Sequence, residues 1–116
     1  MSIKRIESGT HLSKAVVCNG LVFLAGQTAD DDSLDMAGQM KQILAKIDKY
    51  LAEAGTDKTR LLSAVVYLSD MSLKADMDKQ WIPWIGSEPP ARACVGANLG
   101  TPKKLVEIMV TAAQYA

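Results

Sequence analysis

The stretch "MKQILAKIDKYLAEAGTDKTRLLSAVVYLSD", Met40 to Asp70, decides the fold because it places a regular helix directly before a dense apolar strand. Between Met40 and Leu51 the apolar residues recur three and four positions apart, which predicts one buried face of a helix that begins near Met36. Gly55 supplies the expected stop. The run "RLLSAVVYLSD" is too continuous for a half-exposed strand, so we expect a central strand with both faces covered.

The residues before this stretch predict an antiparallel hairpin. Two apolar runs, Ala15 to Cys18 and Leu21 to Ala25, are joined by Asn-Gly, the pair that best tolerates the positive φ angles of a tight hairpin turn. Polar residues follow, and three of them are candidates to cap the helix: Asp32, Ser33 and Asp35.

The residues after the stretch predict a second helix and two more strands. "MSLKADMDKQWIPWIG" has helical spacing, and Pro83 is expected to mark its end. "ARACVGANL" and "LVEIMVTAAQ" have strand character and are separated by a Gly- and Pro-containing turn. The predicted order is ββαβαββ, an α+β domain with two helices on one face of one sheet. The other face needs cover, which we expect another subunit to supply.

Composition limits the classes of function. The 116 residues fit one domain, 1–116, and 13 basic against 13 acidic residues give a formal net charge of +0, which does not favour nucleic acid as a partner. Apolar runs stop well short of the roughly 18 residues of a membrane span, and nothing resembles a secretory signal, so we expect a cytoplasmic protein without membrane contact. Cys18 and Cys94 lack metal-type spacing, which argues against a metal site.

Two charged residues interrupt the last two strands. A buried arginine needs an anion or several acceptors, so Arg92 requires a partner. If the last two strands are antiparallel neighbours with Val95 and Val106 facing the core, Arg92 and Glu107 share the opposite face and can approach one pocket. A structural ion pair between the strands is the alternative, and residue spacing does not choose between the two.

Other side chains with chemical potential have structural alternatives. His11, the single histidine, is more often structural than catalytic without a nearby nucleophile or metal ligand. Cys94, two residues beyond Arg92, is either a thiolate favoured by the cation or a small core residue. Trp81 and Trp84 fill core or subunit contacts, or wall a pocket.

Four segments together resemble one known family. "GLVFLAGQ", "AEAG" followed by "LLSAVVYLSDM", "EPPARACVGANL" and "LVEIMVTA" occur in order over most of the chain and are similar to the RidA family, also called YjgF/YER057c/UK114. The resemblance implies a homotrimer of chorismate-mutase-like α+β subunits with clefts between them. It also implies hydrolytic deamination of reactive 2-imino and enamine acids to 2-keto acids and ammonia without a cofactor.

The same resemblance implies roles for individual residues. Arg92 occupies the "PAR" motif whose arginine binds the substrate carboxylate, Glu107 matches the acidic residue that positions the hydrolytic water, and Cys94 matches a cysteine whose backbone holds substrate. Other positions depart from the family pattern, which points to a branch distinct from the best-studied deaminase: Leu12 stands at its tyrosine, Ala25 at its serine and Asp78 at its helical asparagine. His11, beside Leu12, is a candidate to take over part of the tyrosine's role.

Two other functions stay open beside imine hydrolysis. A trimer that binds small carboxylates or other metabolites without turnover would use the same Arg92. Many members carry names such as translation inhibitor or endoribonuclease, but the neutral charge and the missing base-stacking platform make an action on RNA the less expected alternative.

Overall fold

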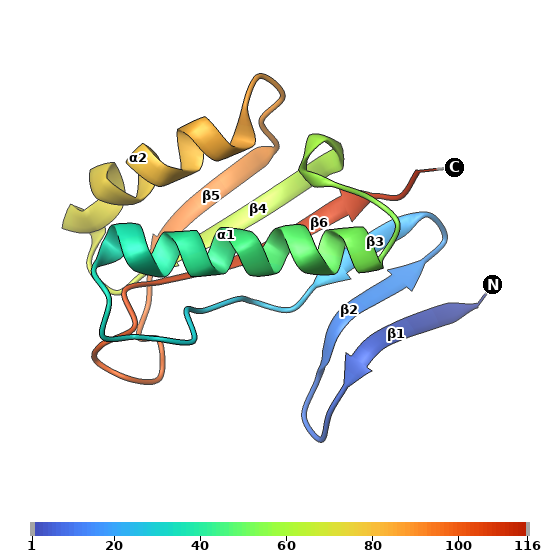
Figure 1. The fold of residues 1–116 in the computed structure, drawn as a ribbon, viewed down its shortest axis with the longest axis horizontal. Helices are drawn as coiled ribbons and strands as arrows, with labels where there is room; N and C mark the ends of the chain where they lie inside the picture. The colour runs from blue at the N-terminus through green and yellow to red at the C-terminus, as the bar shows by residue number, and fades with distance from the viewer. Residues whose placement is uncertain (1, 116) are drawn as a thin grey trace.

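Residues 2–115 form one mixed six-stranded sheet with two α-helices on a single face of it (Figure 1). The computed structural model describes residues 2–115, and the predicted α+β class is confirmed. The strands are β1 (Ile3–Ser8), β2 (Ser13–Cys18), β3 (Leu21–Leu24), β4 (Leu61–Leu68), β5 (Ala91–Gly96) and β6 (Val106–Ala113). The helices are α1 (Met36–Glu53) and α2 (Lys74–Ile85). A short 3₁₀ turn at Lys58–Arg60 follows α1, and another at Met71–Leu73 directly precedes α2. Within residues 2–115, neither helix is long and apolar enough to cross a membrane.

The predicted hairpin is present as β2 and β3. Asn19 and Gly20 have φ angles of 52° and 78°, the left-handed conformation that the turn requires. Strand β2 begins two residues earlier than predicted and β3 ends one residue earlier.

An additional N-terminal strand, β1, corrects the predicted order to βββαβαββ. It pairs antiparallel with β2 and forms one edge of the sheet. Its side chains are exposed except for the half-buried Ile6, so it has no apolar face to reveal itself in the sequence. The β1–β2 hairpin extends beyond the part of the sheet that the helices cover (Figure 1).

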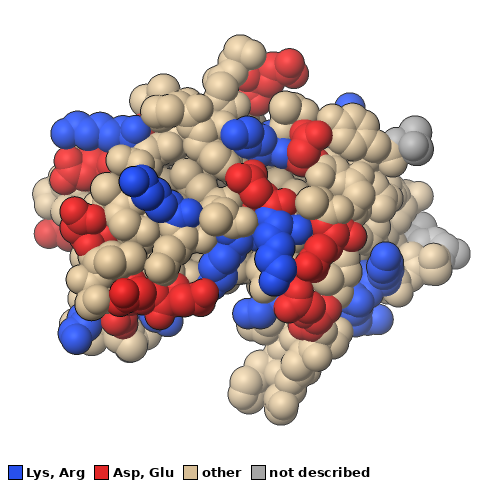
Figure 2. Space-filling view, in the orientation of Figure 1, with Lys and Arg blue, Asp and Glu red and all other residues tan. Residues whose placement is uncertain are grey.

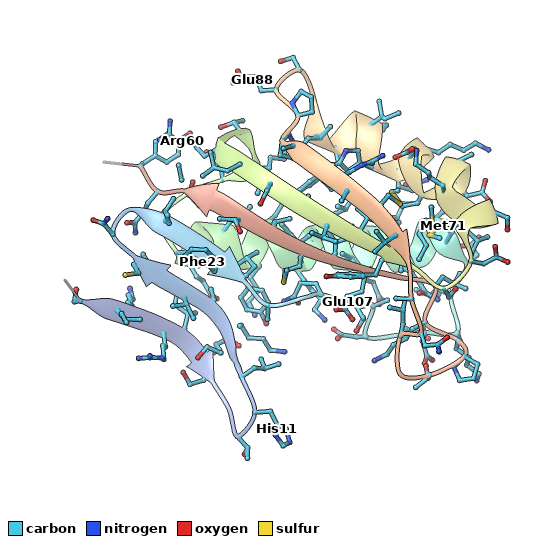
Figure 3. The ribbon with its side chains drawn as sticks, turned by 180° about the vertical axis from the view of Figure 1, so that it is seen from behind. His11, Phe23, Arg60, Met71, Glu88 and Glu107 are labelled. Atoms are coloured by element: carbon cyan, nitrogen blue, oxygen red, sulfur yellow. The ribbon has the colours of Figure 1, made fainter. Side chains whose placement is uncertain are left out.

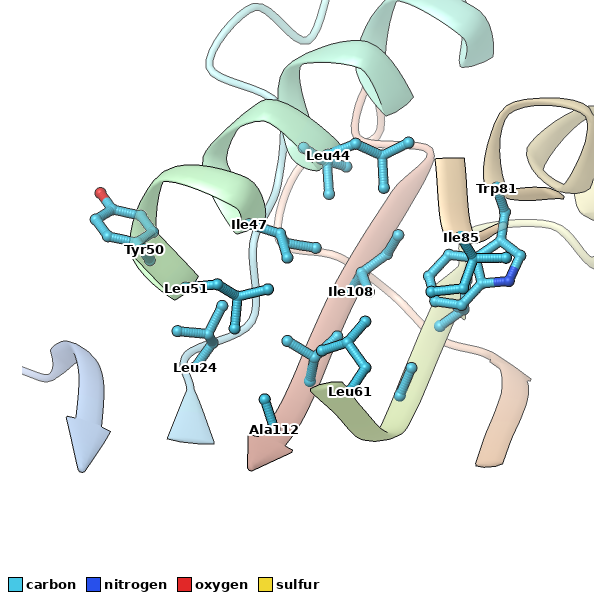
Figure 4. Packing of buried hydrophobic residues seen from close by; sticks show 14 of the residues in the cluster. Leu24, Leu44, Ile47, Tyr50, Leu51, Leu61, Trp81, Ile85, Ile108 and Ala112 are labelled. Carbon is cyan, nitrogen blue, oxygen red and sulfur yellow. The ribbon is translucent and has the colours of Figure 1, made fainter. Parts of the chain in front are cut away.

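Helix α1 begins as the capping residues predict. Among the three candidates, Asp35 is the N-cap, and its Oδ1 accepts a hydrogen bond of 2.9 Å from the backbone nitrogen of Gly38. The apolar stripe of α1 packs on the sheet, where Ile47 and Leu51 approach Ile108 of β6 (Figure 4).

The strand order β1-β2-β3-β6-β4-β5 corrects the expected pairing of the last two strands. Strand β4 lies between them, antiparallel to β6 and parallel to β5. Strand β4 is therefore central, as predicted, but no element within residues 2–115 covers its second face. Ala64 and Val66 are buried beneath the helices, while Val65 and Tyr67 alternate to the other side and are half-buried.

Helix α2 continues past Pro83 to Ile85, two residues beyond its expected end. Proline removes the hydrogen bond to the carbonyl four residues earlier, that of Lys79. Lys79 is exposed, so solvent can satisfy this carbonyl and the helix completes its last turn.

Candidate functional site

Arg92 lies on the edge strand β5 and faces the helices. It is in register with the buried Ala64 of the parallel neighbour β4, so both side chains point to the helix side. Its Nη1 donates a hydrogen bond of 2.6 Å to Oδ1 of Asp78 on α2, and its guanidinium carbon lies 5.5 Å from the ring centroid of Trp81. The Arg92 side chain is 21% exposed, so the charge that needed a partner has a carboxylate and an aromatic face beside it.

Asp78 is held between two cations. Besides Arg92, Nζ of Lys74, one helical turn earlier, donates a hydrogen bond of 3.2 Å to Oδ2. The hydrogen bond from Arg92 lowers the pKa of the Asp78 carboxyl below its ordinary value, and the Lys74 contact acts in the same direction against partial burial. Asp78 is therefore ionised at neutral pH, and these three side chains carry one net positive charge.

A pocket opens beside the Arg92–Asp78 pair. It has a volume of about 310 Å³ and lies between α2, the segment that follows it, and the start of β5. Its apolar walls come from Trp81, Ile82 and Ile85 on α2 and from Pro89 and Pro90 before the strand. Arg92 and Asp78 supply the charged groups among its lining residues, so the pocket combines two charges with apolar walls, as small-molecule sites do.

Glu107 lies on the other face of the sheet, which corrects the expectation that it shares a face with Arg92. It is in register with Tyr67, whose side chain points away from the helices. The expectation took Val95 to face the core, but Val95 pairs with Tyr67, is 42% exposed and lies on the open face, whereas Arg92 and Cys94 alternate to the helix side. Figure 3 looks onto the open face and shows Glu107 there, with Phe23.

Gly26 provides the close contact for the Glu107 carboxylate. A methyl group added at Gly26 would come within 3.0 Å of the carboxyl carbon of Glu107, so only glycine leaves the carboxylate in its place. The segment after β3 is held there because the backbones of Gln27 and Ile108 exchange hydrogen bonds of 2.9 and 3.1 Å. Ala25, a predicted substrate-binding residue, belongs to this segment and is half-buried.

The remaining predicted residues fall in two other places. Cys94 is half-buried on the helix side, two residues beyond Arg92, and packs against the core. His11 and Leu12 are exposed at the turn between β1 and β2, far from Arg92 at the opposite sheet edge (Figure 3). Within residues 2–115 the structure therefore pairs Arg92 with Asp78, places Cys94 on the same strand face as Arg92, and keeps Glu107 and the hairpin turn apart from them.

Two contributors to these groups were not assigned from the sequence. The sequence does not indicate a role for Gly26, because that role depends on its close approach to Glu107 in the folded chain. The sequence allows Trp81 to be either a core residue or a pocket wall, and in the structure it is both: its side chain is buried, and Trp81 lines the pocket beside Arg92. The helical spacing of Trp81 and Asp78, three residues apart, was the available signal that they share one helix side.

The comparisons with known proteins agree with this fold along the whole chain. Residues 2–114 match the family model described as endoribonuclease L-PSP. A RutC family protein from Haemophilus ducreyi is 41% identical over 112 residues, covering 96% of each chain. The RutC family protein YoaB from Escherichia coli is 34% identical over 114 residues, covering 97% of this chain and 99% of its own.

Solved structures extend the agreement. The structure of NMB1025, a YjgF family member from Neisseria meningitidis, superposes with a TM-score of 0.96 at 41% identity and covers 100% of this chain and 98% of its own. A YjgF/YER057c/UK114 family member from Mycobacterium tuberculosis reaches a TM-score of 0.87 at 28% identity, covering 97% and 99%. The chain therefore belongs to the endoribonuclease L-PSP family, the YjgF/YER057c/UK114 family that its sequence motifs resemble.

Proposed function

We propose that this protein hydrolyses reactive 2-imino and enamine acids to 2-keto acids and ammonia, with Arg92 as carboxylate anchor and Glu107 as the base that activates water. The observation that carries the proposal is the half-buried Arg92 guanidinium at the wall of a small, mostly apolar pocket. Planar guanidinium groups bind carboxylates through two parallel hydrogen bonds, and a single hydrogen bond to Asp78 leaves donors for a ligand.

The proposal requires a second copy of the chain, because Arg92 and Glu107 lie on opposite faces of one sheet. The open face carries large apolar side chains, among them Phe23 at 44% exposure and Met109 at 42%. Such a face is typical of a subunit interface. We infer that three copies associate through their open faces and that each site combines Arg92 of one subunit with Glu107 of its neighbour.

The chemistry needs only these two groups. Arg92 binds the substrate carboxylate and thereby fixes the adjacent C=N carbon. Glu107 accepts a proton from water as the water oxygen attacks that carbon, and the C=N electron pair moves onto the protonated nitrogen to give a neutral carbinolamine. The carbinolamine then loses its hydroxyl proton as the nitrogen, protonated again, leaves as ammonia and the 2-keto acid forms.

Binding of small carboxylates without turnover is the second candidate function. It is favoured by the separation of the two groups within residues 2–115, since Arg92 lines the pocket while Glu107, the proposed base, lies on the opposite face of the sheet. Ribonuclease action has no comparable support: the net charge is zero, and Figure 2 shows acidic and basic side chains interspersed over the helix-bearing face instead of a basic surface.

The test is the rate of imine loss. An amino-acid oxidase generates 2-imino acids in place, and their disappearance is followed with and without the protein. We expect the parent protein to accelerate imine hydrolysis. Arg92→Lys should lose this acceleration, because lysine keeps the charge but not the two parallel hydrogen bonds of a guanidinium. Glu107→Gln should bind 2-keto acids almost normally but hydrolyse imines more slowly, because the amide cannot accept a proton. If a panel of small, branched and aromatic imino acids shows no acceleration while 2-keto acids still bind through Arg92, binding without turnover replaces the enzyme.

A further inference from the structure

The Arg92–Asp78 pair leaves hydrogen-bonding capacity on both partners. A guanidinium has five N–H donors, and within residues 2–115 Arg92 donates one hydrogen bond, from Nη1. The Asp78 carboxylate accepts from Arg92 through one oxygen and from Lys74 through the other. Lys74 sits on an exposed, flexible stem with its side chain 46% exposed, so a ligand cation can take its place at little cost.

The pair also opens to the pocket, which a purely structural ion pair does not need to do. Both side chains line the pocket and are about one-fifth exposed. A ligand that enters therefore meets a positive and a negative group side by side, with Nη1 and Oδ1 2.6 Å apart. Two adjacent, opposite charges are the complement of a small zwitterion.

We propose that the Arg92–Asp78 pair is a two-point site for a zwitterionic α-imino or α-amino acid, whose carboxylate binds the unused guanidinium donors while its protonated nitrogen binds Asp78. This inference rests on the proposed role of Arg92 as carboxylate anchor and adds a cation subsite to it. In an α-imino acid the nitrogen-bearing carbon is bonded to the carboxylate carbon, so both charges can reach the adjacent groups at once.

The site selects by charge as well as by shape. A 2-keto acid places a carbonyl oxygen, an acceptor with no proton, where the nitrogen of the zwitterion would donate to Asp78. Two acceptors that face each other cannot form a hydrogen bond, so the keto acid loses that contact. The site therefore holds the protonated imine more tightly than the keto acid that its hydrolysis yields, which favours product release.

The apolar walls limit the rest of the ligand. Trp81, Ile82 and the two prolines face the pocket, so the side chain of the zwitterion is apolar. A volume of about 310 Å³ has to hold the whole molecule, which suits a short aliphatic chain better than an aromatic one. Valine and its 2-keto counterpart, 3-methyl-2-oxobutanoate, are a pair of probes with the same side chain and carboxylate that differ at the α-carbon, which carries an ammonium group and a hydrogen in valine and a carbonyl oxygen in the keto acid.

The test is calorimetric titration of the full-length protein with each probe. We expect the parent to bind valine about tenfold more tightly than the keto acid, the difference of one charge-assisted hydrogen bond. Asp78→Asn should remove or reverse this preference, and Asp78→Glu should keep it because the charge remains. Asp76→Asn is the matched control: Asp76 is exposed on the same helix and pairs with Lys79, so the preference should not change.

The outcomes separate this inference from the proposed anchor. If both probes bind with equal affinity and Asp78→Asn changes nothing, the cation subsite is wrong while Arg92 stays the anchor. If Arg92→Ala binds both probes as the parent does, or if the parent binds neither probe, the anchor and the subsite fail together. Thermal unfolding of each variant shows whether a loss of binding is a loss of fold. If Asp78→Asn is unfolded, Asp78→Glu is compared with the parent instead: the subsite is contradicted if Asp78→Glu folds but no longer binds valine more tightly than the keto acid.

Discussion

At the residue scale, the contact between Gly26 and Glu107 determines where the proposed base lies. The Glu107 carboxylate occupies the space that any side chain at position 26 would fill. Gly26 is not among the glycines with positive φ, so its backbone tolerates alanine and the space is the reason for glycine. Gly26 is therefore a positioning residue for Glu107.

We predict that Gly26→Ala folds normally but displaces the Glu107 carboxylate and lowers kcat for imine hydrolysis about tenfold or more, with a smaller effect on KM. Steady-state kinetics measures both constants. Gly96→Ala is the control, because an added methyl group there meets Met71 at an ordinary 3.6 Å. Unchanged kcat in Gly26→Ala would show that the position of Glu107 does not matter for the rate.

Single residues also show how far the sequence predicts the site. Arg92 in the "PAR" motif and Asp78 on the helix are both predicted site residues, and the structure joins them by a hydrogen bond. The prediction that Arg92 and Glu107 share one face of the sheet was wrong. Counting in steps of two shows which residues of a strand point to the same side, but not which of the two sides faces the core. That choice depends on the register of β5 against β4, a long-range pairing that the local sequence does not contain.

At the scale of elements, regular patterns were predictable and edge elements were not. Strong local patterns predict three elements, and all three are present: the apolar stripe of α1, the hairpin turn at Asn-Gly and the continuous apolar run of β4. Strand β1 has no buried face. Strand β5 pairs parallel to β4 because α2 carries the chain back to the end of the sheet where β4 begins, so that both strands run in the same direction. The elements that the sequence missed or mispaired are therefore the ones fixed by their neighbours.

We predict that Asp35→Ala destabilises the fold by about 1 kcal/mol, because the Gly38 N–H at the start of α1 loses its acceptor. Urea unfolding followed by circular dichroism measures this as a lower midpoint. Asp35→Asn keeps a side-chain oxygen and should stay within a few tenths of a kcal/mol of the parent. Equal loss in both variants would mean that charge at the helix start, not the capping hydrogen bond, stabilises α1.

At the scale of the whole molecule, the open sheet face connects folding to the proposed activity. Helices α1 and α2 cover one face of the sheet except at the β1–β2 hairpin, and the other face exposes Phe23, Met109 and Val95. Figure 3 shows Phe23 and Glu107 on this open face. Covering these side chains with a second copy would stabilise a small domain and would place Glu107 at an interface. Assembly and a complete site are then the same event.

The most direct test of this shared site mixes two variants that are each impaired in imine hydrolysis. Arg92→Ala keeps Glu107 and Glu107→Gln keeps Arg92, so every mixed trimer carries one intact pair if the two groups come from neighbouring subunits. We predict that each variant alone hydrolyses imines far more slowly than the parent and that both are trimers by light scattering. Unfolding and refolding them together should raise the rate above that of either variant and restore part of the parent activity. Mixed trimers that form but stay inactive, beside an active parent, would contradict a site built from Arg92 of one subunit and Glu107 of the next.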